Sequence, residues 1–147
     1  MRVKLAGRPL VSRREASALR RTLRRAARDL VPGDGYEVSI ALVDEPEMAR
    51  LNEMYRGDPV PTDVLSFPQL APGEEAGPAQ GLLGDVVVCV PVAARQAGER
   101  GETLLQEMEV LAVHGLLHLL GYEDETPAGA SEMATMENDI LGRTTSM

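Results

Sequence analysis

Apolar and polar positions alternate along this 147-residue chain in patterns that separate helices from strands. Over 13–30, alanine and leucine recur every three or four residues between arginines, which predicts an amphipathic helix ending near Pro32. Ser12 and Glu15 have the spacing of a capping box at its start. Four further helices are predicted, over 45–55, 91–97, 103–120 and 131–141.

Apolar residues that alternate or run together predict three strands, over 36–42, 64–67 and 82–90. The last is almost wholly apolar, which is typical of a strand buried on both faces. Residues 69–81 are rich in Pro and Gly and are expected to form a flexible loop, and 142–147 a disordered tail. We expect an α+β fold in one domain over 1–147, with a small mixed sheet of about four strands and helices packed on it.

The composition narrows the class of protein. Apolar residues make up 44% of the chain, enough for a substantial core, and the single cysteine, Cys89, excludes an intrachain disulfide. No apolar run has the length of a membrane span and no secretory signal is recognisable, so a cytoplasmic location is expected. Tryptophan is absent and Phe67 is the one phenylalanine, which argues against a stacking platform built from several aromatic residues.

Charge is distributed unevenly along the chain. The net charge is −8, yet residues 1–30 hold ten Lys and Arg against two acidic residues, or +8, and the other 117 residues hold five against 21, or −16. The basic end is therefore a candidate for binding a polyanion such as RNA. An ordinary solvated helix face explains the arginines equally well. The candidate phosphate-binding residues are Arg20, Arg21, Arg24, Arg25 and Arg28.

The two histidines of the chain, His114 and His118, are four residues apart and so share one face of the predicted helix over 103–120. Gly121 permits the chain to fold back after this helix, and Asp124 follows three residues later. Two imidazoles and a carboxylate suit one Zn²⁺ ion with a fourth position open, as in catalytic sites. The alternatives are two hydrogen-bonded histidines and an acidic turn without a ligand role.

Four stretches in the same order carry a family resemblance: Leu51–Arg56, Pro61–Pro68, Gly84–Cys89 and His114–Tyr122. Together they resemble the YbeY family of bacterial rRNA maturation endoribonucleases, over roughly 36–141. The residues that fit the family's tail are Met133, Met136, Glu137, Ile140 and Leu141. The resemblance implies a metal-dependent endoribonuclease specific for single-stranded RNA. It would process the 3′ end of small-subunit rRNA and act in ribosome quality control. Implied partners are small-subunit ribosomal proteins and an assembly GTPase.

The family usually has histidine as the third ligand, whereas this chain has Asp124. Carboxylates also bind zinc, but the negative charge makes the bound ion a weaker Lewis acid than three neutral imidazoles would. Divalent metals other than zinc are therefore also compatible with the site. The resemblance also assigns a catalytic role to Arg56, which would stabilise charge on a phosphate. Without the resemblance, a solvated loop arginine is the slightly favoured interpretation. No general base is identified, because Glu109 points elsewhere on the helix, and attack by water or by the RNA 2′-hydroxyl stays open.

Two other functions compete with the nuclease. A zinc metalloprotease has a similar ligand spacing, but its pattern needs glutamate directly after the first histidine, where this chain has Gly115. A ribosome-assembly factor without catalysis would use the metal only to stabilise the fold. Asp63 is expected to fix its loop through backbone hydrogen bonds. The residues expected to be plain core are Cys89, Met133 and Met136.

Overall fold

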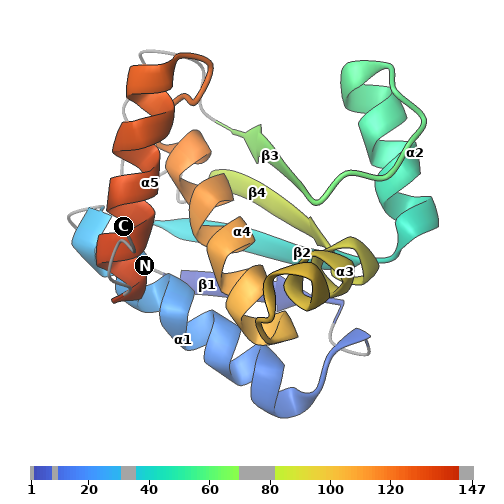
Figure 1. Cartoon of the computed structure of the whole chain (residues 1–147), viewed down its shortest axis with the longest axis horizontal. Coiled ribbons are helices and arrows are strands. Elements are labelled where there is room, and N and C mark those ends of the chain that lie inside the picture. The colour runs from blue at the N-terminus through green and yellow to red at the C-terminus, as the bar shows by residue number, and fades with distance from the viewer. Residues whose placement is uncertain (1, 8–9, 31–35, 70–81, 143–147) are drawn as a thin grey trace.

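A four-stranded mixed sheet organises the molecule, as seen in a computed structural model that describes residues 2–7, 10–30, 36–69 and 82–142 (Figure 1). The sheet order is β1-β2-β4-β3, with β3 antiparallel to β4 and the other neighbouring pairs parallel. This confirms the expected α+β class and the strand number. The strands are β1 (Arg2–Ala6), β2 (Glu37–Val43), β3 (Val64–Pro68) and β4 (Leu82–Cys89).

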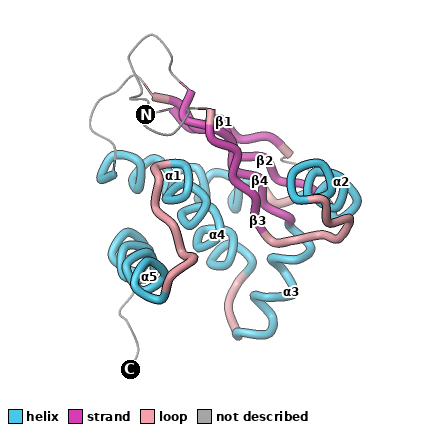
Figure 2. Tube along the Cα trace, turned by 90° about the horizontal axis from the view of Figure 1, so that it is seen from above, coloured by secondary structure: helices cyan, strands magenta, loops and turns pink. Residues whose placement is uncertain are grey.

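Five helices cover the two faces of the sheet. Figure 2 shows α1, α4 and α5 on one side and α2 on the other. Among the described helices, none combines the length and apolarity needed to cross a lipid bilayer. The helices are α1 (Arg13–Leu30), α2 (Glu45–Arg56), α3 (Val90–Arg100), α4 (Leu104–Leu119) and α5 (Pro127–Leu141).

Each interior strand contributes to two apolar cores because successive side chains point to opposite faces. On β4, Val86 and Val88 face the larger core beneath α1 and α4, and Val87 and Cys89 face the smaller one beneath α2. All four are buried, which confirms the prediction of a strand covered on both sides. Met133 is buried in the larger core, so it is also a core residue as expected.

The start of α1 follows the predicted capping chemistry. The Ser12 N–H donates to Glu15 Oε1 at 2.9 Å, and the Glu15 N–H donates to Ser12 Oγ at 3.1 Å. These two bonds form the reciprocal capping box at the start of α1. The buried face of α1 then includes Leu19 and Leu23, while its arginines lie largely on the outer side.

Several boundaries differ from the predictions. Strand β1 was not predicted, since only Val3 and Leu5 alternate there, and pairing with β2 is what makes it a strand. Helices α3 and α5 are longer than predicted at one or both ends. Arg56 is the last residue of α2 rather than part of a loop, because the helix ends at Gly57, whose φ is 74°. The predicted loop after Gln69 and the tail after Gly142 lie outside the described residues.

Helix α4 approaches the sheet closely at Gly115. A Cβ atom added there would lie 2.6 Å from Val86 Cγ1 and 3.0 Å from Ser66 Oγ. The Ser66 hydroxyl donates to the Gly115 carbonyl oxygen at 3.0 Å, which ties β3 to α4. Any side chain at position 115 would push the helix away from the sheet.

We expect Gly115→Ala to lower the free energy of unfolding by about 1–3 kcal/mol, as overpacked cores do, despite the better helix propensity of alanine. Gly98→Ala is the matched control, since a Cβ on that helical glycine meets nothing within 4 Å. The control should be neutral or more stable by about 0.5–1 kcal/mol. Urea unfolding of both variants measures the difference, and equal effects would contradict the close approach.

Candidate metal centre

The end of α4 is built to reverse the chain. The Tyr122 N–H donates to the Leu117 carbonyl at 3.1 Å and the Gly121 N–H to the His118 carbonyl at 3.0 Å. This pair of bonds is a Schellman motif, and its left-handed residue is Gly121, with φ of 97°. A Cβ on Gly121 would meet nothing within 4 Å, so the backbone angle rather than space requires glycine. The reversal returns residues 122–125 toward the histidines.

The two imidazole rings are held in one tautomer by their outer nitrogens. His118 Nδ1 lies 2.9 Å from the Tyr122 carbonyl oxygen, and His114 Nδ1 lies 2.5 Å from Glu137 Oε1. A carbonyl and a carboxylate accept hydrogen bonds, so both Nδ1 atoms carry the proton in the neutral rings. Both Nε2 atoms then present lone pairs, and they face each other at 3.0 Å. Two lone pairs so close require a cation between them, either a proton or a metal ion.

Asp124 completes a three-atom cluster with these nitrogens. Its Oδ2 atom lies 3.2 Å from His114 Nε2 and 3.7 Å from His118 Nε2. Ligands about 2.0–2.2 Å from a tetrahedral ion lie about 3.3–3.6 Å from one another, so the three atoms have suitable spacing. The Asp124 side chain is 41% exposed, which leaves one side of the cluster open to solvent. The residues therefore fit a divalent ion with an open position.

A second glycine makes room for the loop that carries Asp124. In α5, a Cβ on Gly129 would lie 2.4 Å from the Glu123 carbonyl oxygen. The Gly129 N–H also donates to the side chain of Thr126, the N-cap of α5. Loop and helix therefore pack together, and α5 brings Glu137 against His114.

The cluster opens into a cleft of about 640 Å³. One wall is the end of α2 with Tyr55 and Arg56, the floor includes Asp63 and Ser66, and the other wall carries the histidines. Asp63 Oδ1 accepts from the Val64 N–H at 2.8 Å, which agrees with the predicted role of fixing its loop. Arg56 and the three metal-ligand candidates thus border the same space, although they come from segments about 60 residues apart.

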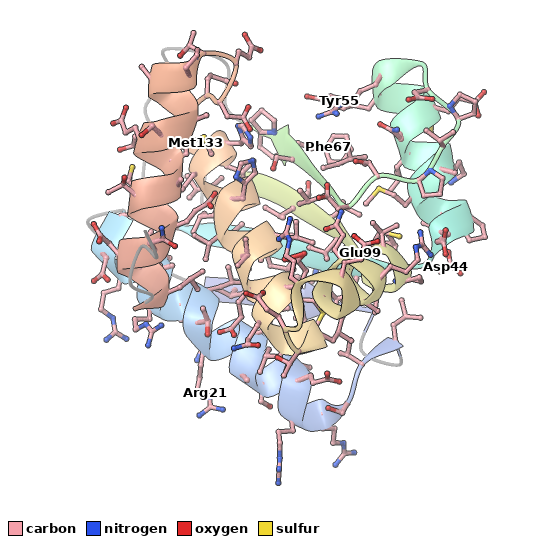
Figure 3. All side chains as sticks on the ribbon, in the orientation of Figure 1. Arg21, Asp44, Tyr55, Phe67, Glu99 and Met133 are labelled. Atoms are coloured by element: carbon pink, nitrogen blue, oxygen red, sulfur yellow. The ribbon has the colours of Figure 1, made fainter. Side chains whose placement is uncertain are left out.

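The arginines of α1 lie outside this cleft. Figure 3 shows Arg21 pointing into solvent at the opposite end of the molecule from Tyr55. Two of the five candidates contact backbone carbonyls: Arg20 donates to Val3 and Arg25 to Ile140. Arg21, Arg24, Arg25 and Arg28 are exposed, and Arg20 is half-buried. Any RNA bound by α1 would therefore have to extend around the molecule to reach the cleft.

Comparison with known proteins assigns the chain to a family. The family model "Endoribonuclease YbeY" matches residues 8–145. The chain belongs to the YbeY family of endoribonucleases. A relative from Moorella thermoacetica, named endoribonuclease YbeY, is 48% identical over 131 residues, covering 85% of this chain and 83% of the relative. Another of that name, from Halorhodospira halophila, is 50% identical over 110 residues, covering 74% and 71%.

A solved structure shares the fold. The solution structure of TM1509 from Thermotoga maritima superposes with a TM-score of 0.64 at 26% identity, covering 95% of this chain and 89% of the other. Membership of the YbeY family makes this chain an endoribonuclease, a hydrolase that acts on RNA phosphodiester bonds in rRNA maturation. The family match also begins before α1, earlier than the stretch that carries the resemblance in the sequence.

The geometry disfavours the metalloprotease alternative. The glutamate that such an enzyme needs would stand at position 115, where even a Cβ atom collides with Val86. Glu109, dismissed above as a general base, accepts a hydrogen bond from Thr22 of α1 and is not among the residues that line the cleft.

Glu137 fits the family's tail in the sequence but was not predicted to belong to the site. A carboxylate on the same helix face as Met133 and Ile140 was the available signal, since an acidic residue on an apolar face needs a partner. Its partner, His114, is 23 residues away in sequence. Only the packing of α5 on α4 brings the two side chains together.

The pH dependence of stability follows from this contact. In the metal-free protein, the hydrogen bond that His114 donates to Glu137 raises the pKa of His114 above 6.5, its ordinary value, against the opposing effect of burial. A raised pKa stabilises the folded state fully below about pH 6.5, and this stabilisation is lost as pH rises through the folded pKa. As pH rises from about 6.5 through the folded pKa of His114, the free energy of unfolding of the wild type should therefore fall relative to that of Glu137→Gln.

Urea unfolding of chelator-treated protein between about pH 5.5 and about 8.5 measures this difference. Glu137→Gln keeps a hydrogen-bond acceptor for His114 Nδ1 and removes only the charge. Parallel stability curves for the two proteins across the window would show that the carboxylate does not act on the imidazole.

Proposed function

We propose that this chain is a metal-dependent endoribonuclease specific for single-stranded RNA, with Zn²⁺ held by His114, His118 and Asp124. The observation that carries the proposal is the convergence of three ligand atoms and Arg56 on one cleft in a member of the YbeY family. The substrate proposed is the 3′ region of small-subunit rRNA, during maturation and ribosome quality control. Ribosome assembly would place the protein in the cytoplasm, with small-subunit proteins and an assembly GTPase as partners.

The donor set supports a divalent cation. The two nitrogens are borderline-soft ligands that suit zinc, and Asp124 adds a hard oxygen that also suits Mn²⁺ or Fe²⁺. When bound, the ion supplies Lewis-acid chemistry by polarising a phosphoryl oxygen and lowering the pKa of water. Glu137 and the Tyr122 carbonyl orient the two rings so that both Nε2 atoms would be free to hold a bound ion.

Arg56 is the cationic side chain among the residues that line the cleft. Its guanidinium offers a planar set of donors that matches phosphate oxygens. Asp63, Glu123 and Glu125 line the same cleft and repel a phosphate, so Arg56 is needed to hold it. We assign it the stabilisation of charge that develops on the phosphate during cleavage.

The exposed arginines of α1 are proposed as a second contact with the RNA backbone, remote from the reaction. Binding there neutralises phosphates and releases counterions, so affinity should fall steeply with salt. The acidic cleft cannot supply this contact itself.

Replacing the third ligand tests the metal site. We expect Asp124→Asn to lose bound metal and to reduce cleavage by more than the roughly 10- to 100-fold typical of residues that only orient a ligand. Asp124→His should retain metal, because imidazole is a zinc ligand. Metal analysis of the purified proteins and cleavage of a single-stranded RNA measure both effects.

Glu125→Gln is the matched control for metal content, since it removes the same charge one residue away from the ligand. Full metal content in Asp124→Asn would contradict the proposed ligand set.

Arg56→Ala tests the catalytic assignment. We expect kcat to fall by about 100-fold or more, in line with the loss of one charge-stabilising donor. The melting temperature should not change, because Arg56 is exposed at the helix end. Arg50→Ala is the control, as an exposed arginine on α2 that pairs with Glu47 outside the cleft. Unchanged cleavage in Arg56→Ala would refute this role.

A ribosome-assembly factor without catalysis predicts a different result. The metal-loaded wild type would then cleave no RNA, and His118→Ala would unfold the chain.

A further inference from the structure

Tyr55 is an aromatic side chain exposed at the edge of the metal cleft. All four aromatic residues of the chain lie in described segments, and Tyr55 is the exposed one, with 51% of its surface accessible. It borders the same cleft as Arg56 and the two histidines. Neither the capping of α2 nor the apolar cores explain why a large ring is exposed there.

The Tyr55 ring rests against a second aromatic side chain, that of Phe67. Its centroid lies 4.7 Å from that of Phe67, with the planes inclined at 66°, an edge-to-face contact. Phe67 packs against the smaller core between α2 and the sheet. Figure 3 shows Tyr55 extending from α2 on the side of β3, where Phe67 lies. A ring held in this way loses little entropy when a flat ligand stacks on its open face.

The chemistry of the cleft favours a nucleobase as that ligand. Acidic residues line it in excess over Arg56, so additional contacts with phosphates are unfavourable. Stacking is uncharged and every base has a π face, so it adds affinity without that electrostatic cost. Tyr55 and Arg56 line the same cleft, so a base attached to a phosphate held by Arg56 has the Tyr55 ring available for stacking.

We propose that Tyr55, supported by Phe67, is the stacking platform for an unpaired base next to the scissile phosphate of RNA. This inference rests on the proposed function. A base in a duplex is already stacked and cannot present its face, so the platform selects single-stranded RNA. A single supported ring thus provides the base stacking that several aromatic residues provide in other proteins that bind single-stranded nucleic acids.

Steady-state cleavage of a single-stranded RNA by the metal-loaded protein tests the platform. We expect Tyr55→Ala to raise KM about 10-fold, with a smaller change in kcat, since loss of one stacked base has effects of this order. Tyr55→Phe keeps the ring and should bring KM back toward the wild-type value. Met54→Ala is the matched control, because Met54 is 73% exposed on the same helix end and does not line the cleft.

Abasic substitution of the RNA distinguishes stacking from a general apolar contact. In the wild type, removing the base at one position flanking the cleavage site should raise KM as much as Tyr55→Ala does. In Tyr55→Ala the same abasic substitution should not raise KM further, because base and ring contribute through one shared contact. The four KM values form a double-mutant cycle that measures this coupling. Independent effects of Tyr55→Ala and the abasic substitution at every flanking position would overturn the platform. An effect of Met54→Ala on KM equal to that of Tyr55→Ala would also overturn it, since it would show a general apolar contact with RNA.

Quenching of tyrosine emission separates failure of the platform from failure of the proposed function. Adding single-stranded oligouridylate to the metal-loaded wild type should quench part of the emission of its three tyrosines, and this component should vanish in Tyr55→Ala. Quenching without any RNA cleavage would support the platform and refute the nuclease. Cleavage by the wild type without any quenching of tyrosine emission would overturn the platform and leave the nuclease proposal intact.

Discussion

Two imidazole nitrogens that face each other at 3.0 Å are the constraint on which the rest of this structure depends. Because the outer nitrogen of each ring donates to an oxygen, both inner nitrogens present lone pairs, and only a cation relieves their repulsion. The surrounding elements serve this arrangement. The reversal after α4 supplies the carbonyl of Tyr122, the following loop supplies Asp124, and α5 supplies Glu137.

The close packing of α4 on the sheet gives this centre a rigid base. Gly115, next to the first histidine, brings the helix backbone against Val86 and lets its carbonyl accept from Ser66 of β3. The same strand carries Phe67, on which Tyr55 rests. Metal centre and opposite wall are therefore linked through β3, by the Ser66 hydroxyl on one side and the Phe67 ring on the other.

Charge is separated in space as well as along the chain. The cleft concentrates carboxylates that attract a cation and repel an RNA backbone, whereas the exposed arginines of α1 lie away from the cleft. The carboxylates around the metal centre repel phosphates. An RNA phosphate therefore binds there only if the metal and Arg56 offset this negative charge. Uncharged contacts with bases are therefore valuable at this site.

The spacing of His114, His118, Gly121 and Asp124 was sufficient to predict which groups converge, because helix periodicity and a left-handed glycine are local properties. The capping box of α1 and the double burial of β4 were also predictable from local pattern. Contacts between distant segments were not: β1 becomes a strand only by pairing with β2, and Glu137 meets His114 only because α5 packs on α4. The contact between Tyr55 of α2 and Phe67 of β3 likewise depends on the tertiary structure. Periodicity records which face of an element is buried, but it does not record which other element covers that face.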